Sequence, residues 1–187
     1  MKVVIYRHKK EGRIHRRCMN SIARGFRIKR VKHVQSINDF EQVGDVGVTF
    51  GQPNLHNKTR YSKNIKLIYK KYSPGRLMVF EGGFLKRKQY FALGLGGVAG
   101  TAIFPRPKVV DPLRFEALKL EVKDWHEGDY VLLTGQVPWD STVQYVNYRD
   151  WVYNKIAEIR QHTDRPIVWR PHPLAKSRRR FSFTIAF

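Results

Sequence analysis

The sequence has a single cysteine, Cys18, so no disulfide can form within the chain. No group of cysteines and histidines shows the spacing of a structural zinc site either. A lone thiol is most often a partly buried side chain in a reducing compartment, and we adopt that interpretation for Cys18. The sequence therefore predicts a fold without disulfides and without a metal site.

Long hydrophobic runs are also absent. The N-terminal stretch MKVVIYRHKKEGR has one short apolar run before dense charge, which is typical of neither a signal peptide nor a membrane span. No segment combines a basic face with a broad apolar one, as helices on lipid surfaces do. We therefore expect a cytoplasmic protein that does not bind membranes; the sequence leaves its oligomeric state open.

Acidic residues are scarce. Thirty-six Lys and Arg stand against 15 Asp and Glu, which gives a formal net charge of +21. Residues 1–30 hold 11 basic residues and one acid, residues 58–88 hold 10 and one, and residues 165–180 hold six and none. Residues 108–164, in contrast, hold seven basic and ten acidic residues. Because such an excess repels itself unless anions offset it, we expect a polyanionic partner, most simply a nucleic acid.

The apolar residues that are present predict a folded chain. Of 187 residues, 42% are hydrophobic and 13% aromatic, which is more than disordered chains carry. Short apolar runs at 2–6, 30–34 and 46–50 predict strands, with a helix at 15–26 and a turn or short helix at 39–42. Alternation of strands and helices favours a parallel sheet, so the expected fold class is α/β with Rossmann-like units.

Two further apolar runs, at 65–69 and 76–80, are separated by the turn signal Ser73-Pro74-Gly75. The second run ends at Glu81-Gly82-Gly83. A carboxylate followed by two glycines at a strand end is typical of a ligand-binding loop, because glycine allows close backbone approach. A solvated loop acid is an equally good interpretation of Glu81.

Residues 94–100 contain a G-x-G-x-x-A pattern, but 101–105 do not begin a helix as a dinucleotide fingerprint requires. We interpret this stretch as a tight glycine-rich loop near a site. Three prolines follow, and the charge changes sign in the same place. We expect an N-terminal α/β domain over 1–107, a connector over 108–128 and a second α/β domain over 129–187.

The second domain begins with a predicted βαβ unit: a strand at 130–134, a polar loop at 135–142, a helix at 148–160 and a strand at 167–170. On the helix, an apolar face is formed by Tyr148, Val152, Ile156 and Ile159. The two strands should be parallel, with a right-handed crossover.

In such a unit the loops that follow the two strands face the same crevice. Their hydrogen-bonding side chains suit a phosphosugar or nucleotide; these are Gln136, Asp140, Ser141, Thr142, Arg170 and His172. Simpler roles are also open. Asp140 caps a turn, His172 holds the shape of its loop, or Arg170 pairs with Asp164 or Asp140.

The stretch VLLTGQ at 131–136, with Asp140 and Ser141 and then RPIVWRPHP at 165–173, resembles the second domain of capsule-type and phage-encoded glycosyltransferases with the GT-B fold. EGGFLKRKQY at 81–90, with LGLGG at 93–97, resembles a first-domain segment of such phage proteins. The resemblance covers about half of the chain. It implies a GT-B-like protein with an incomplete second domain, since GT-B domains continue beyond the His-Pro loop.

The resemblance also assigns roles. It places Gln136, Asp140, Arg170 and His172 near a nucleotide-sugar donor, which is a substrate, so no cofactor is implied. It places Glu81 on the acceptor side, where an inverting transferase needs a general base. A phage-encoded protein of this kind would act in the host cytoplasm.

The basic blocks predict nucleic-acid contacts. In one block lysines interleave with Tyr61, Tyr69 and Tyr72, so that ammonium groups meet phosphates while rings stack on bases. The candidate contacts are Arg13, Arg16, Arg17, Lys63, Lys66, Lys70, Lys71, Lys86, Arg87, Lys88, Arg178, Arg179 and Arg180, with Arg24 on the same helix face as the first three. Two hypotheses remain: a glycosyltransferase acting on DNA or another polyanion, or a non-enzymatic phage nucleic-acid-binding protein on a degenerate α/β scaffold.

Overall fold

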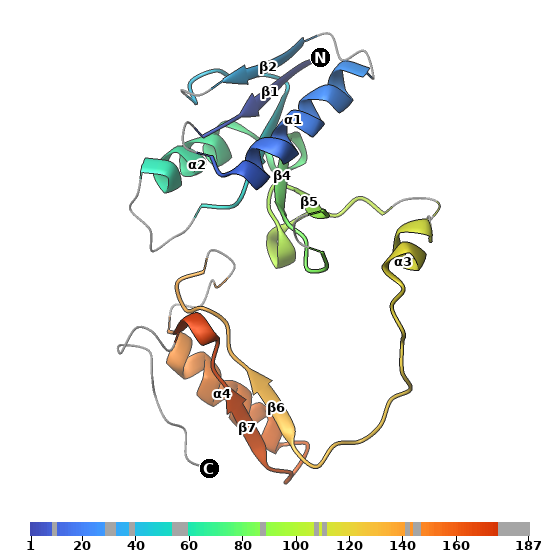
Figure 1. Ribbon diagram of the computed structural model, residues 1–187. Coiled ribbons are helices and arrows are strands. Elements are labelled where there is room, and N and C mark those ends of the chain that lie inside the picture. Colours follow the sequence, from blue (N-terminus) through green and yellow to red (C-terminus); the bar gives the residue numbers. More distant parts are fainter. Residues whose placement is uncertain are drawn as a thin grey trace. The chain divides into compact units, whose positions relative to one another are not determined.

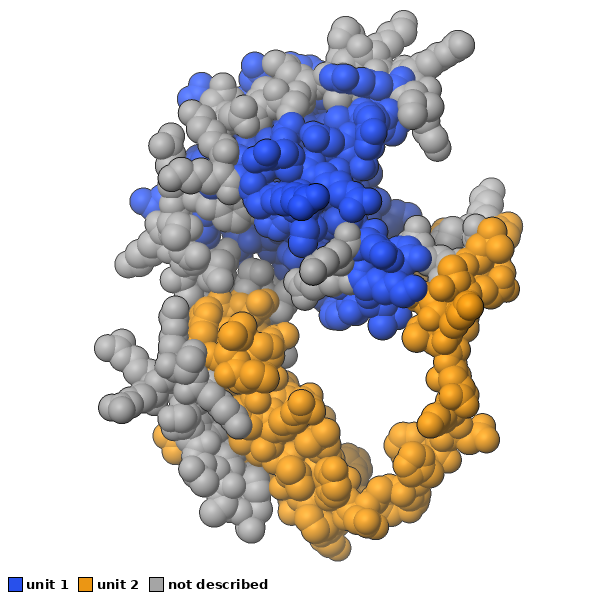
Figure 2. Space-filling view, in the orientation of Figure 1, with its two compact units in different colours: residues 1–105 blue, residues 106–187 orange. Residues whose placement is uncertain are grey.

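The computed structural model of the chain describes residues 1–8, 11–28, 33–37, 40–53, 60–86, 89–106, 109, 112–140, 143 and 147–175. The chain divides into two compact units (Figures 1 and 2), which are called unit 1 (residues 1–105) and unit 2 (residues 106–187).

Unit 1 is built on a five-stranded sheet with the order β2-β1-β3-β4-β5 (Figure 1). The strands are β1 (Lys2–Tyr6), β2 (His33–Ile37), β3 (Val46–Phe50), β4 (Leu77–Gly82) and β5 (Phe91–Leu95). The first four run parallel to their neighbours, and β5 runs antiparallel to β4. The α/β class with a mainly parallel sheet is therefore confirmed.

Two helices cover opposite faces of this sheet. α1 (Arg13–Ile28) buries Cys18 and Met19 against the face that carries Val3, Ile5 and Val48. On the other face α2 (Arg60–Lys71) packs its apolar side, including Ile65 and Ile68, against Val4, Leu77 and Val79. Successive residues of a strand point to opposite faces, so the continuous apolar run of β1 contributes side chains to both cores.

Several predicted elements of unit 1 are confirmed and some are corrected. The strands at 2–6 and 46–50 have the predicted bounds. The strand predicted at 30–34 is β2, which begins three residues later, at His33. The apolar run at 65–69 lies inside α2, and the run at 76–80 is β4, preceded by the short 3-10 helix η1 (Pro74–Arg76).

The glycine-rich stretch at 94–100 differs in part from the predicted loop, because Gly94 and Leu95 are the last two residues of strand β5 (Phe91–Leu95). At Gly94 a Cβ would lie 2.4 Å from the carbonyl oxygen of Gly97, and Gly96 has a φ of +70° that favours glycine. The chain then forms the 3-10 helix η2 (Ala99–Thr101) and turns back to pair Ile103 with Leu95. Residues 102–105 do not begin an α-helix, so the dinucleotide interpretation stays rejected.

Unit 2 contains β6 (Val131–Thr134), α4 (Tyr148–Arg160) and β7 (Ile167–Arg170), with parallel strands. The predicted apolar face of α4 packs on the strands through Val152 and Ile156. Asn147 caps the helix: its side-chain oxygen accepts the backbone N–H groups of Arg149 and Asp150. The predicted βαβ unit is therefore confirmed. The short helices α3 (Leu113–Leu118) and η3 (Pro173–Ala175) flank it.

Across the described ranges, no helix has both the length and the apolar character needed to cross a membrane.

Candidate functional site

The strand order of unit 1 creates a topological switch point between β1 and β3. From β1 the chain passes through α1 to β2 on one side, and from β3 it passes through α2 to β4 on the other. Open α/β sheets bind ligands outside the carboxyl ends of the strands at such a point. A small cleft lies there; it is lined by Tyr6, His8, Glu11, His15, Met19, Phe40, Thr49, Phe50 and Ile65.

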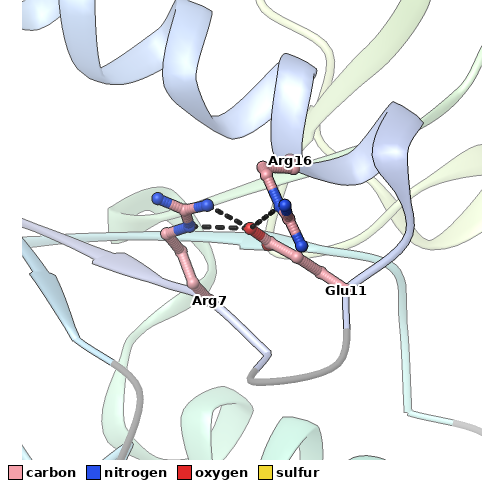
Figure 3. Close-up of polar contacts among 3 residues, drawn as sticks. All are labelled: Arg7, Glu11 and Arg16. Carbon is pink, nitrogen blue, oxygen red and sulfur yellow. Dashed lines mark hydrogen bonds and ion pairs between the residues drawn. The ribbon is translucent and has the colours of Figure 1, made fainter.

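A buried carboxylate fixes the loop that follows β1 (Figure 3). The Glu11 side chain is only 6% exposed, and its Oε1 accepts two hydrogen bonds from Arg7, one of them from Nε at 2.9 Å. Arg16 Nε lies 3.9 Å from the same oxygen. A buried charge is tolerated only when it is paired, so this contact ties the loop to the first turn of α1.

The opposite wall of the cleft holds a strained residue. Phe40 has a φ of +68°, a conformation that costs a bulky side chain on the order of 1–3 kcal/mol. Its ring stacks on Tyr6 with centroids 6.1 Å apart, and Lys71 Nζ donates to the carbonyl oxygens of Phe40 (2.5 Å) and Glu41 (2.8 Å). These contacts offset the strain. Strained backbone conformations are often found at functional sites.

Two polar side chains in the cleft are available to a ligand. Thr49 is 1% exposed, and the His15 ring lies 4.0 Å from the Phe50 ring. Within the described part of the chain, neither the Thr49 hydroxyl nor the His15 imidazole has a hydrogen-bond partner. A hydroxyl and an imidazole can each donate and accept, so they can bind a small polar group.

The outer face of α1 is mostly basic. Its exposed residues include Arg13, Arg16, Arg17, Arg24 and Arg27, and the helix has no acidic residue. At 3.6 residues per turn these five arginines fall within an arc of about 100°. The predicted row on one helix face is thus present, and we call it the arginine stripe.

The lysines of α2 are less uniform. Lys63 and Lys70 are exposed, whereas Lys66 is half-buried and Lys71 is held by the carbonyl oxygens of the Phe40 loop. The contact at Lys71 gives it a structural role that the sequence did not predict.

The predicted stacking of the α2 tyrosines on bases is wrong for two of them. Tyr72 is 8% exposed, and its hydroxyl lies 2.9 Å from the Tyr6 hydroxyl and accepts the Gly44 N–H at 3.1 Å. Tyr69 packs against the same core. Both rings lie on the side that faces the core, with Ile65 and Ile68. The lysines and tyrosines that alternate along the sequence therefore do not alternate on the exposed surface. The side chain of Tyr61 lies outside the described residues.

Glu81 lies near the end of β4, opposite Ala92 of β5. Its carboxylate is partly buried and accepts the N–H of Gly82 at 3.0 Å. It shares the carboxyl edge of the sheet with the cleft but is not among the cleft's lining residues. Lys86 is exposed at the tip of the β4–β5 hairpin, while Arg87 and Lys88 lie outside the described residues.

The two loops of unit 2 that were predicted to converge begin side by side, because Gly135 N–H donates to the Arg170 carbonyl oxygen at 2.8 Å. Arg170 is exposed and forms no ion pair with Asp140 or Asp164, which removes that alternative for the described chain. His172 Nδ1 accepts the Leu174 N–H at 3.2 Å, as a loop-shaping histidine would.

The other predicted residues of unit 2 are placed in part. Gln136 is exposed, and its side-chain oxygen accepts the N–H of Val137 at 2.8 Å. Asp140 is partly buried, with Val143 N–H donating to its backbone carbonyl at 3.1 Å. The predicted contacts Ser141, Thr142, Arg178, Arg179 and Arg180 lie outside the described residues.

Cys18 is not a reactive thiol. Its side chain is buried under α1, and burial raises the pKa of the thiol to about 11. In the described part of the chain, no three His, Cys, Asp or Glu side chains gather closely enough to hold a metal ion.

Comparisons of the chain with protein families, with curated proteins and with solved structures found no match. Function therefore has to be argued from this chain's own residues. Of the residues that form or anchor the cleft, the sequence singled out only Arg16 and Lys71, and it predicted both as nucleic-acid contacts. The sequence signal in this region is a strand that ends in a basic loop before a helix. This pattern does not show which strand lies next to the first strand in the sheet.

Proposed function

We propose that unit 1 binds nucleic acid along the arginine stripe of α1 and the adjoining carboxyl edge of the sheet. The observation that carries the proposal is the stripe itself: five exposed arginines on a helix without a single acid. From Arg13 to Arg27 the stripe is about 21 Å long at 1.5 Å per residue. That length suits a row of several phosphates better than one small anion.

The chemistry of the stripe supports the same partner. Arginine presents a planar fork that binds phosphate through two parallel hydrogen bonds. Both α1 and α2 begin at the carboxyl edge, where the positive ends of their dipoles add to the positive charge of Arg13. The stripe begins at this edge, and the net charge of +21 agrees with a polyanionic partner.

The test is the salt dependence of binding. Fluorescence anisotropy with a labelled 20-mer should show affinity that falls steeply with salt, because each phosphate contact releases about one counterion. The double variant Arg17→Ala/Arg24→Ala should lower the slope of log K against log salt by about 2. The matched control is Arg149→Ala, an exposed arginine on α4 of unit 2. Equal slopes for the wild type and the double variant would refute the role of the stripe.

A second candidate function, transfer of a sugar from a nucleotide donor, is favoured by the hydrogen bond that joins Gly135 to Arg170. This contact brings Gln136, Arg170 and His172 to the carboxyl edge of one parallel pair, in agreement with the resemblance to GT-B transferases. The exposed Arg170 guanidinium would take the donor phosphate. The role of general base is assigned to Glu81 by the resemblance alone.

This candidate is tested separately from nucleic-acid binding. A nucleotide sugar at about a hundred times its dissociation constant should stabilise the fold by roughly 2.7 kcal/mol, and Arg170→Ala should abolish that shift in Tm. Glu81→Gln should abolish turnover and leave the fold and DNA affinity unchanged. Turnover equal to that of the wild type would remove Glu81 from the mechanism, and a full panel of nucleotide sugars without any shift would refute donor binding.

A further inference from the structure

The hairpin between β4 and β5 extends beyond the carboxyl edge of the sheet. Phe50 of β3 pairs with Phe80, and β4 then continues to Gly82, which pairs with Phe91 of β5. Past this pair Gly83 N–H donates to the Tyr90 carbonyl oxygen at 3.0 Å, and Gln89 N–H donates to the Lys86 carbonyl oxygen at 2.7 Å. The backbone of the hairpin is therefore hydrogen-bonded on both sides of its tip.

The apolar side chains at the tip are exposed. Phe84 is 95% exposed and Leu85 is 47% exposed. Burial of a phenylalanine side chain in a core stabilises a fold by about 1.5–3 kcal/mol, and Phe84 at the tip makes no such contribution. The next residue, Lys86, has a φ of +42°, an uncommon conformation for a side chain of its size. The tip thus combines an unburied aromatic ring with an uncommon backbone conformation.

The sequence around the ring is basic. Lys86 is followed by Arg87 and Lys88, and no acid lies between Gly82 and Phe104. The hairpin also stands at the same edge of the sheet as the loop that carries Arg7 and Glu11. An aromatic ring among cations, at the edge of a basic surface, is the arrangement by which proteins stack on bases while cations contact the backbone.

We propose that Phe84 is a stacking residue for unpaired nucleobases: its ring lies on an exposed base while Lys86 contacts the neighbouring phosphate. This inference rests on the proposed binding of nucleic acid, and it adds a preference for single-stranded or unpaired segments. Nucleic acid is favoured over an anionic lipid surface, because the tip offers only Phe84 and Leu85, and no amphipathic helix, for burial in lipid. A protein partner would not explain why cations directly follow the ring.

The experiment compares Phe84→Ala and Phe84→Trp with the wild-type full-length chain. The probes are a single-stranded 20-mer that contains 2-aminopurine, the blunt duplex of the same sequence, and anionic phosphatidylserine vesicles. Phe104→Ala is the matched control, because Phe104 is a phenylalanine of unit 1 that is 53% exposed and lies away from the tip. Equal melting temperatures should show that all four proteins fold alike.

We expect Phe84→Ala to bind the single strand about ten-fold more weakly, with duplex affinity unchanged. Its slope of log K against log salt should equal that of the wild type, because no charge is lost. The 2-aminopurine fluorescence should be quenched by the wild type and by Phe84→Trp, but not by Phe84→Ala.

Three outcomes overturn the inference. Phe84→Ala binds the single strand as Phe104→Ala does, loses as much duplex affinity as single-strand affinity, or changes only the binding of vesicles. A wild type that binds no nucleic acid even at low salt would instead refute the proposed function itself. The two failures are therefore distinguishable in one set of titrations.

Discussion

The two units share the parallel βα arrangement but differ in how completely their strands are covered. In unit 1 helices lie on both faces of a five-stranded sheet, and Val3, Val4 and Ile5 are 0% exposed. In unit 2 one helix covers one face of a two-stranded sheet, and Leu132 and Val168 on the other face remain 45% and 44% exposed. Two strands alone are marginally stable, so unit 1 should hold most of the stability of the chain.

The positive charge is concentrated in the unit with the larger core. The well-covered unit 1 carries two of the three basic blocks, while the sparsely packed unit 2 holds the mildly acidic stretch at 108–164. Charge repulsion is best tolerated where the core is largest. Unit 1 is therefore the unit that can better tolerate a basic binding surface. The variants of each unit test whether the two units unfold independently.

The largest expected effect comes from a cavity in the core of unit 1. Ile68→Ala removes a side chain that is 0% exposed, and such a change costs about 2–5 kcal/mol. All four tryptophans of the chain lie in unit 2, so tryptophan fluorescence reports the unfolding of unit 2, whereas circular dichroism reports both units. Denaturant titration should show a lower midpoint by circular dichroism and an unchanged midpoint by fluorescence.

The reciprocal variant is Val152→Ala in α4, also 0% exposed, which should shift the fluorescence midpoint and leave the contribution of unit 1 to the circular dichroism transition unchanged. If either variant shifts both midpoints equally, the units unfold together and the comparison between them fails.

Two glycines of unit 1 should respond with opposite signs. At Gly94 a Cβ would lie 2.4 Å from a backbone oxygen, so Gly94→Ala should cost on the order of 1–3 kcal/mol. At Gly25, within α1, nothing lies within 4 Å of a new Cβ, so Gly25→Ala should stabilise by about 0.5–1 kcal/mol. Thermal unfolding followed by circular dichroism measures both. A loss at Gly25 would mean that this face of α1 is covered by something else.

The sequence predicted the central elements of both units well, and the reasons are local. Residues 2–6, 46–50 and 167–170 are short apolar runs, rich in β-branched residues and ended by polar or turn residues, and each became a strand with those bounds. The helix predicted at 148–160 combined an apolar face with an acid in its first turn and a base in its last. Such signals lie within one segment and need no knowledge of its neighbours.

The failures have equally physical causes. The run at 65–69 is too short for its periodicity to separate a strand from a buried helix segment. β5 was hidden because its glycine serves a close backbone approach, which no propensity encodes. The cleft could not be predicted at all, since it depends on β1 lying beside β3, about forty residues away, and on a positive φ at Phe40.

A buried ion pair in unit 1 should matter more than an exposed one in unit 2. Glu11→Gln removes the negative charge that pairs with Arg7 and Arg16. Because the Glu11 side chain is only 6% exposed, the change should lower the free energy of unfolding by about 1–3 kcal/mol. Glu127→Gln breaks the ion pair with Arg165. The Glu127 side chain is 74% exposed and the Arg165 side chain 45%, so the free energy of unfolding should change too little to measure. Urea unfolding of both variants provides the measurement. Equal costs would mean that the Glu11 loop is not the fixed element that its contacts indicate.

The smallest effect concerns the thiol under α1. Burial raises the pKa of Cys18 from 9.0 to about 11, so the folded chain disfavours the thiolate that the unfolded chain forms more readily. The associated stability is fully present below pH 9 and is lost as the pH rises toward 11. Alkylation by iodoacetamide at pH 8 should therefore be slow in the native protein and fast in urea. Cys18→Ala should flatten the fall in stability between pH 9 and 11. Fast native alkylation would show that α1 opens from the sheet, and the arginine stripe would then lie on a helix that moves rather than on a fixed one.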